Sequence, residues 1–160
     1  MTNNTSLQNL QKALKMEFTA AHQYQLHAHV LEDWGLDKLA AQMRTEMQEE
    51  LDHSDLYMAR IMFLNGSPEV DFYNKPVQAE TLVAMFKADL ADEEEAIQFY
   101  TTASQHAAEV GDIGTRLLFE QIVIDEEGHK SWLELQLSLI DRIGEQAFSA
   151  MYVSATGAAE

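Results

Sequence analysis

Helix-breaking sequence is concentrated in one stretch of this chain, residues 65–78, which reads NGSPEVDFYNKPVQ. This stretch contains the only two prolines of the 160 residues, Pro68 and Pro76. On both sides of it the sequence is dominated by residues of high helix propensity. The chain is therefore predicted to be all-α, with one long connection near its middle.

The remaining breaks divide the chain into four long helices. The first is expected to begin with Thr5 or Ser6 as its cap, with Gln8 completing a capping box, and to end near residue 33. A strong "NGSP" break ends the second helix, and a Gly-Asp break at Gly111 separates the third from the fourth. The second and third predicted helices are about 37–64 and 79–109. The fourth follows the break at residues 111–112 and reaches about residue 143, and a short fifth helix is expected at 145–153.

The lengths of the connections predict how the helices are arranged. Only a few residues separate the first helix from the second, and the third from the fourth, so each pair should form an antiparallel hairpin. Residues 65–78 span roughly 45 Å when extended, which matches the length of a helix of about 28 residues. We therefore expect a four-helix bundle with a long crossover between its second and third helices.

Composition and charge narrow the class of protein. With 46% hydrophobic residues, the chain is expected to be one domain over residues 1–160. It has no cysteine, so any bound metal must be held by oxygen and imidazole ligands. The net charge of -17 disfavours nucleic acid as a partner. No segment resembles a signal peptide or a membrane span, so we expect a cytoplasmic protein that does not insert into membranes.

Acidic residues interrupt the apolar face of every predicted long helix. An ionised carboxylate in a protein interior is costly unless it is paired or bound to a metal. These faces carry too few basic residues to neutralise the acids. The acids that fall on the predicted buried faces are Glu17, Glu46, Glu50, Asp89, Glu93 and Glu126.

The motif Glu-x-x-His occurs twice, in EELDH at residues 49–53 and in DEEGH at residues 125–129. Residues three apart on a helix share one face, so the Glu and His of each motif can reach the same ion. Adding 76 to the residue number carries Glu50 to Glu126 and His53 to His129. The same shift carries Glu17 to Glu93 and Tyr24 to Tyr100. This indicates a pseudo-twofold axis relating the two hairpins, with two metal ions bound near it.

The predicted ligands are four glutamates and two histidines, which suit first-row ions such as Fe or Mn. Each ion would have one His, one terminal Glu and two bridging Glu, leaving positions where O2 or peroxide could accept electrons. Asp89 and Asp125 are candidates to orient the second ring nitrogen of the histidines, although Asp125 could equally be a solvated surface residue. The ligand set is predicted to be Glu17 and Glu93 as terminal ligands, Glu50 and Glu126 as bridges, and His53 and His129.

The chain resembles the bacterioferritins of the ferritin-like di-iron superfamily along nearly its whole length. The segments that carry the resemblance are EFTAAHQYQLHAHVLEDWGLDKL, EELDHSDLYMARIMFLNGSP and DEEGHKSWLELQLSLI. The resemblance implies a hollow shell of twenty-four subunits, each with a di-iron ferroxidase centre. It also implies oxidation of Fe(II) by O2 or H2O2, and iron storage and detoxification as a ferric mineral.

The resemblance also implies roles for individual residues. All six residues of the ligand set match the family's ligands. The family's aromatic residues beside the centre fall on Tyr24, Tyr57 and Trp132, which could pass electrons to it or could simply pack in the core. Of these three residues, we expect Tyr24 to belong to the catalytic site.

The chain departs from the family at Leu51, where bacterioferritins carry the methionine that binds haem between two subunits. Leucine cannot ligate iron, so we expect no haem in a homo-oligomer, while co-assembly with a haem-binding sister subunit stays open. Met43 and Met47 are expected to serve in packing. Some bacterioferritins have an iron site on the inner surface, and its positions fall here on Thr45 and Glu49. Neither residue is a histidine, so an iron-transfer route that depends on a histidine at this site is in doubt.

Two other protein classes compete with iron storage. One is a non-storage di-metal oxidase or peroxidase similar to rubrerythrin or manganese catalase, which the site chemistry alone leaves open. The other is a DNA-protecting mini-ferritin, disfavoured because such proteins place their ligands between subunits. The histidines without ligand spacing are expected to be surface or structural residues: His22, His27, His29 and His106.

Overall fold

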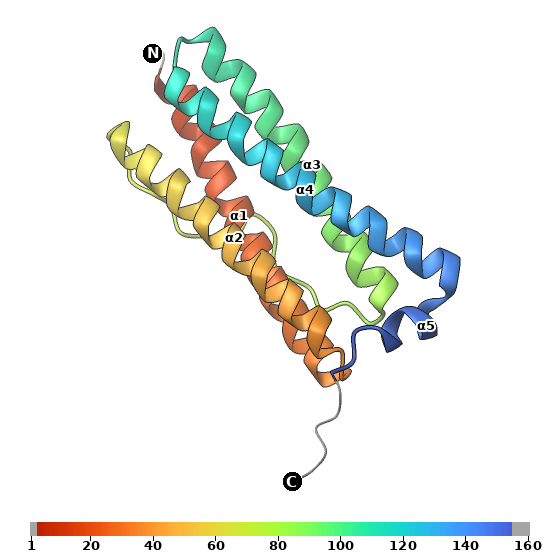
Figure 1. Cartoon of the computed structure of the whole chain (residues 1–160). Helices are drawn as coiled ribbons and strands as arrows, with labels where there is room; N and C mark the ends of the chain where they lie inside the picture. The colour runs from red at the N-terminus through yellow and green to blue at the C-terminus, as the bar shows by residue number, and fades with distance from the viewer. Residues whose placement is uncertain (1–2, 155–160) are drawn as a thin grey trace.

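The computed structural model describes residues 3–154, and the regular structure of this range is helical. Residues 1–2 and 155–160 of the predicted single domain lie outside it. Four long helices run side by side as a bundle, and a short fifth helix lies across one end (Figure 1). The helices are α1 (Asn3–Asp33), α2 (Asp37–Phe63), α3 (Leu82–Glu109), α4 (Ile113–Ile143) and α5 (Glu145–Ala150).

The predicted topology is confirmed. Helices α1 and α2 form one antiparallel hairpin, and α3 and α4 form the other (Figure 1). The crossover between α2 and α3 runs along α1. Near its start, Gln11 Nε2 donates to the Ser67 carbonyl (2.7 Å), and near its end Gln23 Nε2 donates to the Val77 carbonyl (2.9 Å). The crossover therefore covers the length of the bundle on the side of α1.

Three helix boundaries differ from the sequence prediction. Helix α1 begins at Asn3, so the predicted cap and capping box at Thr5 to Gln8 are wrong, and Ser6 lies buried within the helix. Helix α3 begins three residues later than predicted because Thr81 caps it, with Oγ1 accepting from the Ala84 amide (3.1 Å). Helix α5 ends at Ala150 rather than at residue 153.

The core is divided into two apolar clusters. One contains Leu14 and Phe119, and the other contains Leu31, Phe86 and Phe148, the last contributed by α5. In each long helix the residues of the two clusters are separated by a stretch that carries buried acidic residues, as at residues 46–53 of α2 and 126–129 of α4. A polar layer therefore crosses the middle of the bundle between two hydrophobic ends.

Candidate metal centre

All six residues of the predicted ligand set meet in this polar layer. Each long helix supplies at least one of them, and α2 and α4 each supply a Glu and a His from one Glu-x-x-His motif. Every one is between 1% and 7% exposed, so the carboxylates and imidazoles are removed from bulk water. The helix faces that were predicted to be buried, on which these six residues lie, are thus confirmed as buried.

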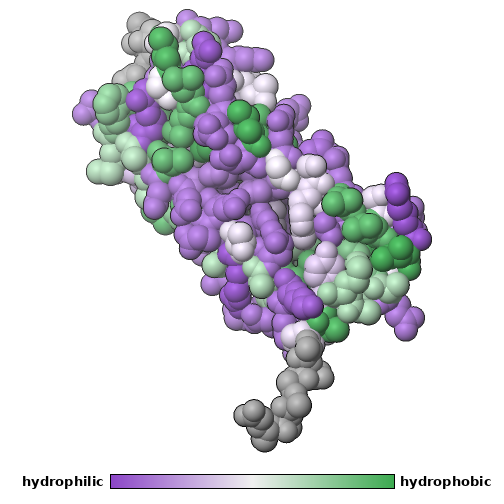
Figure 2. Space-filling view, in the orientation of Figure 1, coloured by the Kyte–Doolittle hydropathy of each residue, from purple (hydrophilic) through white to green (hydrophobic). Residues whose placement is uncertain are grey.

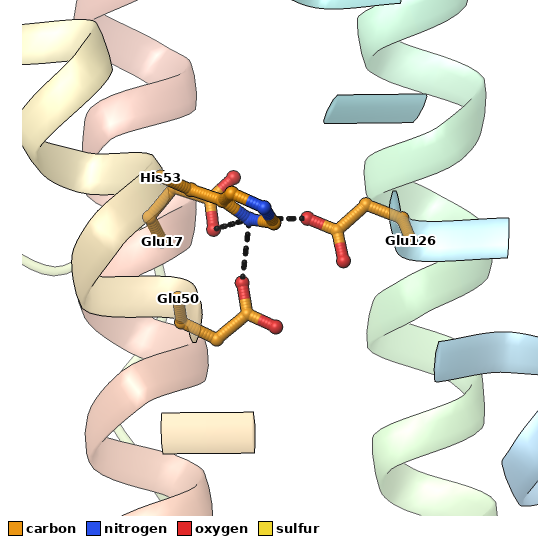
Figure 3. Close-up of side chains that lie close together, drawn as sticks. All are labelled: Glu17, Glu50, His53 and Glu126. Atoms are coloured by element: carbon orange, nitrogen blue, oxygen red, sulfur yellow. Dashed lines mark ion pairs between the residues drawn. The ribbon is translucent and has the colours of Figure 1, made fainter. Parts of the chain in front are cut away.

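One half of the centre surrounds His53 (Figure 3). Its Nδ1 lies 3.2 Å from Glu126 Oε1 and 3.4 Å from Glu50 Oε2. Glu17 Oε2 lies 3.6 Å from the same nitrogen. One ligand atom from each of these four residues lies within 4.8 Å of the others, which is close enough for all four to bind one ion.

The other half surrounds His129. Its Nδ1 lies 2.9 Å from Glu126 Oε2 and 3.0 Å from Glu50 Oε1, and Glu93 Oε1 is 3.7 Å away. These four residues also form a group whose ligand atoms lie within 4.8 Å of one another. The two halves share Glu50 and Glu126, and the two imidazole rings lie 6.2 Å apart between centroids.

The shared carboxylates divide their oxygens between the two halves. Glu50 directs Oε2 to His53 and Oε1 to His129, and Glu126 directs Oε1 to His53 and Oε2 to His129. A carboxylate in this position can bind one ion through each oxygen. The cluster thus consists of two groups of four residues that share Glu50 and Glu126, and each group is completed by one His and one further Glu.

Several atoms that point into the centre have no hydrogen-bond partner among the described residues. They are buried, and each lies between 2.9 and 3.2 Å from an atom of another ligand without the geometry of a hydrogen bond. The donor set is oxygen and nitrogen without sulfur, which fits first-row divalent ions. The atoms without a hydrogen-bond partner are His53 Nδ1, His129 Nδ1, Glu50 Oε1 and Glu126 Oε2.

Two tyrosines tie the hairpins together through the terminal ligands. The hydroxyl of Tyr100 on α3 donates to Glu17 Oε1 on α1 (2.5 Å). The hydroxyl of Tyr24 on α1 donates to Glu93 Oε1 on α3. These two contacts exchange under the shift of 76 residues, which supports the pseudo-twofold relation inferred from the sequence.

The second nitrogen of each histidine faces carboxylates outside the ligand set. His53 Nε2 lies 3.3 Å from Asp125 Oδ2, in agreement with one predicted orienting residue. His129 Nε2 lies 2.7 Å from Glu49 Oε2 and 3.1 Å from Glu46 Oε2, and neither contact was predicted. The same shift relates 49 to 125, so the symmetry seen in the sequence could have revealed Glu49.

The prediction that Asp89 orients a metal-binding histidine is wrong. Asp89 is buried and pairs with His27, whose Nδ1 lies 3.0 Å from Asp89 Oδ1. His27 is also buried, and its Nε2 lies 2.8 Å from Gln23 Nε2. The pair therefore joins α1 to α3 beside the crossover, and helical spacing alone could not distinguish this use of Asp89 from a role at the centre.

Crowding of carboxylates shifts the pKa values of the side chains in the polar layer. Burial, reinforced by the neighbouring Glu126, raises the pKa of Glu50 and Glu93 well above the ordinary range. Burial alone would lower the pKa of His53 and His129, but the adjoining carboxylates outweigh it and raise both. Burial also opposes ionisation of Glu126, yet contact with both histidines lowers its pKa to about 2. Protons on the histidines therefore offset part of the negative charge.

The other aromatic residues of the site lie in the flanking clusters. Tyr57 is fully buried and packs against Tyr100 (5.7 Å between ring centroids) and Phe119. Trp132 packs edge-on against Phe86, with 5.8 Å between ring centroids. Neither makes a hydrogen bond to a ligand among the described residues, so packing accounts for both positions.

The other positions named in the sequence analysis lie outside the ligand set. Met43 is fully buried, and Met47 packs against the same apolar cluster, as expected. Leu51 is partly buried, and Thr45 is exposed and donates to the Ala41 carbonyl. His29 is exposed, while the partly exposed His22 lies 2.8 Å from the Phe18 carbonyl.

A pocket reaches the centre from the side of α1 and α3. It extends from Tyr73 and Asn74 of the crossover to Glu17 and Glu93. This cavity of about 30 Å³ lies beside the carboxylates of Glu17 and Glu93. Separately, no helix among residues 3–154 is long and apolar enough to cross a membrane.

Comparisons with known proteins agree with this architecture. A family model described as ferritin-like domain matches residues 7–143. The bacterioferritin of Rhodobacter capsulatus is 42% identical over 151 residues, covering 94% of each chain, and that of Brucella melitensis is 33% identical over 154 residues, covering 96% of each. A solved structure of the R. capsulatus bacterioferritin matches with a TM-score of 0.93 and 40% identity over 96% of each chain. That structure is described as having a metal-free dinuclear site and a haem iron in a crystallographic special position.

Proposed function

The chain belongs to the bacterioferritins, within the ferritin-like family, and from this we propose that it oxidises Fe(II) at the di-metal centre and stores the ferric product. The observation that carries the proposal is the division of the Glu50 and Glu126 oxygens between His53 and His129. Such an arrangement holds two ions side by side, as a two-electron oxidation requires.

The ligand set binds the substrate and makes its oxidation favourable. Glu50 and Glu126 would bridge two Fe(II) ions, while Glu17 and Glu93 each bind one ion. Two ions held there each give up one electron, so that O2 with two protons becomes H2O2, or H2O2 with two protons becomes two waters. Four buried carboxylates favour the more highly charged ferric state over the ferrous state.

Residues around the ligands keep them in the required protonation state. Glu49 and Asp125 accept from Nε2 of His129 and His53, which leaves each Nδ1 lone pair facing the ions. Tyr24 contacts the terminal ligand Glu93 directly, and we assign it to the catalytic site as the residue that orients this ligand. The partner reactants are Fe(II) and either O2 or H2O2.

The oligomer that we propose is a homo-oligomeric shell of twenty-four subunits. A mass near twenty-four times 18.1 kDa in solution would support storage. A dimer or dodecamer would contradict it. Because Leu51 offers no haem ligand, haem would enter only through co-assembly with a haem-binding sister subunit.

Aerobic loading of the metal-free protein with excess Fe(II) tests the proposal. We expect a rapid phase that consumes two Fe(II) per chain, followed by retention of much more iron. Retention of only about two ions per chain would favour the non-storage oxidase or peroxidase. His129→Ala should remove the rapid phase, whereas His29→Ala, at an exposed histidine of α1, should leave it unchanged.

A further inference from the structure

One buried carboxylate near the di-metal centre has no role among the metal ligands. Asp89 on α3 is 2% exposed and pairs with the fully buried His27 on α1, with 3.0 Å between Oδ1 and Nδ1. Among the described residues, only the ring of His27 donates a hydrogen bond to it. An ionised carboxylate can accept about four hydrogen bonds. A single donor therefore leaves most of this capacity unused, which is costly in a protein interior.

Gln23, one turn earlier on α1, fixes the tautomer of His27. Its side-chain amide makes two hydrogen bonds with the backbone of Val77 in the crossover, because Nε2 donates to the carbonyl and Oε1 accepts from the amide, both at 2.9 Å. The Gln23 amide cannot turn over without losing both, so its Nε2 faces His27 Nε2 as a donor at 2.8 Å. His27 Nε2 must then accept, and the ring proton lies on Nδ1, facing Asp89. His27 is therefore neutral and does not cancel a negative charge on Asp89.

The internal repeat shows that helix packing does not require this polar group. On the other side of the pseudo-twofold axis, the positions equivalent to Gln23, His27 and Asp89 are apolar: Phe99, Ala103 and Ala13. The two alanines are buried in an apolar cluster, and Phe99 packs against the same cluster. The polar group thus occurs only on the side of the crossover, which indicates a purpose other than stability.

A small cavity separates Asp89 from the metal ligands. The cavity of about 30 Å³ between α1 and α3 is lined by Asp89 and by residues of the ligand set. This volume is large enough for a water molecule, which could hydrogen-bond to Asp89 and to the ligands in turn. The titratable groups that face Asp89 or the same cavity include His27 and Tyr24 from α1, Glu50 from α2, Asp92 and Glu93 from α3, and Glu126 from α4.

The surroundings of Asp89 allow it to hold and release a proton. Burial raises the pKa of Asp89 above its ordinary value, and contact with His27 offsets only part of this rise. When Asp89 is protonated, one oxygen still accepts from His27 Nδ1 while the new O–H can donate into the cavity. Both protonation states therefore fit the same arrangement of the helices.

We propose that Asp89 supplies a proton to the oxidant at the di-metal centre, with His27 and Gln23 as its positioning residues. This inference rests on the proposed function. Two Fe(II) ions each give one electron to O2, and two protons complete H2O2. One of these protons leaves Asp89 for a water in the cavity, and that water passes one of its own protons to the oxidant. The O–H bond of Asp89 breaks as an O–H bond of H2O2 forms, and the carboxylate regains a proton from solvent.

The second proton can come from the opposite side of the centre. A pocket between α2 and α4 is lined by Glu49 and Asp125, the two carboxylates behind the metal-binding histidines. This face is predominantly hydrophilic across its middle, with hydrophobic residues gathered toward the two ends of the bundle (Figure 2). Solvent therefore reaches the centre's outer carboxylates there, whereas the α1–α3 side depends on the enclosed Asp89.

Asp89→Asn tests the proton transfer. The amide keeps the size of the side chain and an acceptor for His27 Nδ1, but it holds no acidic proton. The readout is the rate of the rapid oxidation phase, followed by stopped flow after mixing metal-free protein with Fe(II) in aerobic buffer. We expect this rate to fall at least about tenfold, as when a general acid is lost. The number of Co(II) ions bound per chain should stay at the wild-type value.

Formate separates proton transfer from a structural role. Asp89→Ala removes the carboxyl group beside the cavity, and formic acid is small enough to take its place. Added formate should raise the oxidation rate of Asp89→Ala in proportion to its concentration, and should leave Asp89→Asn unchanged because the amide fills the space. Absence of this recovery would show that the pair of His27 and Asp89 serves only to join the helices.

Asp92→Asn is the matched control, because it makes the same change of charge on the same helix and beside the same cavity. It should keep the wild-type rate. An equal loss in Asp92→Asn and Asp89→Asn would show that the cavity needs only negative charge, and would overturn the role of Asp89. If the wild type oxidises Fe(II) and Asp89→Asn matches it, this inference fails and the proposed function stands. If the wild type oxidises no Fe(II), the proposed function fails, and the role of Asp89 fails with it.

Discussion

Tyr100 donates a hydrogen bond across the bundle to Glu17, with 2.5 Å between the hydroxyl and Oε1. The donor belongs to the second hairpin and the acceptor to the first. Tyr24 and Glu93 make the reverse contact, so each hairpin positions a carboxylate of the other that we propose as a terminal metal ligand. The hairpins are thereby joined at the centre itself, where both hydroxyls and both carboxylates are buried.

These symmetric tyrosines allow an orienting role to be separated from an electron-transfer role. Each of Tyr24→Phe and Tyr100→Phe removes one hydrogen bond to a terminal ligand and should weaken Mn(II) binding to a similar extent, by about tenfold. If Tyr24 also passes an electron, only Tyr24→Phe should abolish a tyrosyl radical signal in freeze-quenched samples after Fe(II) oxidation. Equal signals in the two variants would restrict Tyr24 to orienting Glu93.

The bridging and terminal ligands should differ in how many ions their loss affects. Glu50 contacts both halves of the centre, whereas Glu93 contacts only the His129 half. Glu50→Ala is therefore expected to weaken both ions, and Glu93→Ala only one, each by at least about tenfold. The number of Co(II) ions bound per chain, measured by equilibrium dialysis, separates the two cases. Loss of both ions in Glu93→Ala would contradict the assignment of Glu93 as terminal.

Much of this centre could be predicted because helical spacing and an internal repeat are both properties of the sequence. The repeat at 76 residues linked Glu17 to Glu93, and the cost of burying both then required a cation. The topology was predicted from residues 65–78, which when extended are long enough to cross the whole bundle. These arguments need no knowledge of how side chains meet in space.

Contacts between helices were harder to predict. Asp89 and Glu46 both lie on buried faces, yet one pairs with His27 and the other with His129. Which partner each acid meets depends on the rotation and stagger of neighbouring helices, which periodicity does not determine. The start of α3 was misplaced for a local reason, since Thr81 caps the helix although residues 79–80 also have helix-compatible side chains.

Metal binding should release protons and strengthen as pH rises. Carboxylates next to His53 and His129 raise the pKa of both imidazoles, so each carries an extra proton at neutral pH when no ion is bound. An ion at Nδ1 displaces that proton, and each proton released raises the binding constant about tenfold per pH unit. Burial also raises the pKa of the ligands Glu50 and Glu93, so their protons add to those of the histidines. Calorimetric titration with Mn(II) in buffers of different ionisation enthalpy should therefore report at least two protons per chain. A binding enthalpy independent of the buffer would show that the histidines are already neutral.

Leu51 should determine whether a homo-oligomer of this chain takes up haem. The side chain is partly buried on α2 and offers no atom that can ligate iron. The wild type, reconstituted with haem, is expected to show no Soret band with bis-methionine character. Leu51→Met supplies a thioether at that position and should produce the band, with one haem shared between two chains. Leu51→Ile is the matched control, because it changes the shape of the side chain without adding a ligand. A Soret band of equal intensity in the wild type and in Leu51→Ile would place the haem ligand at another residue.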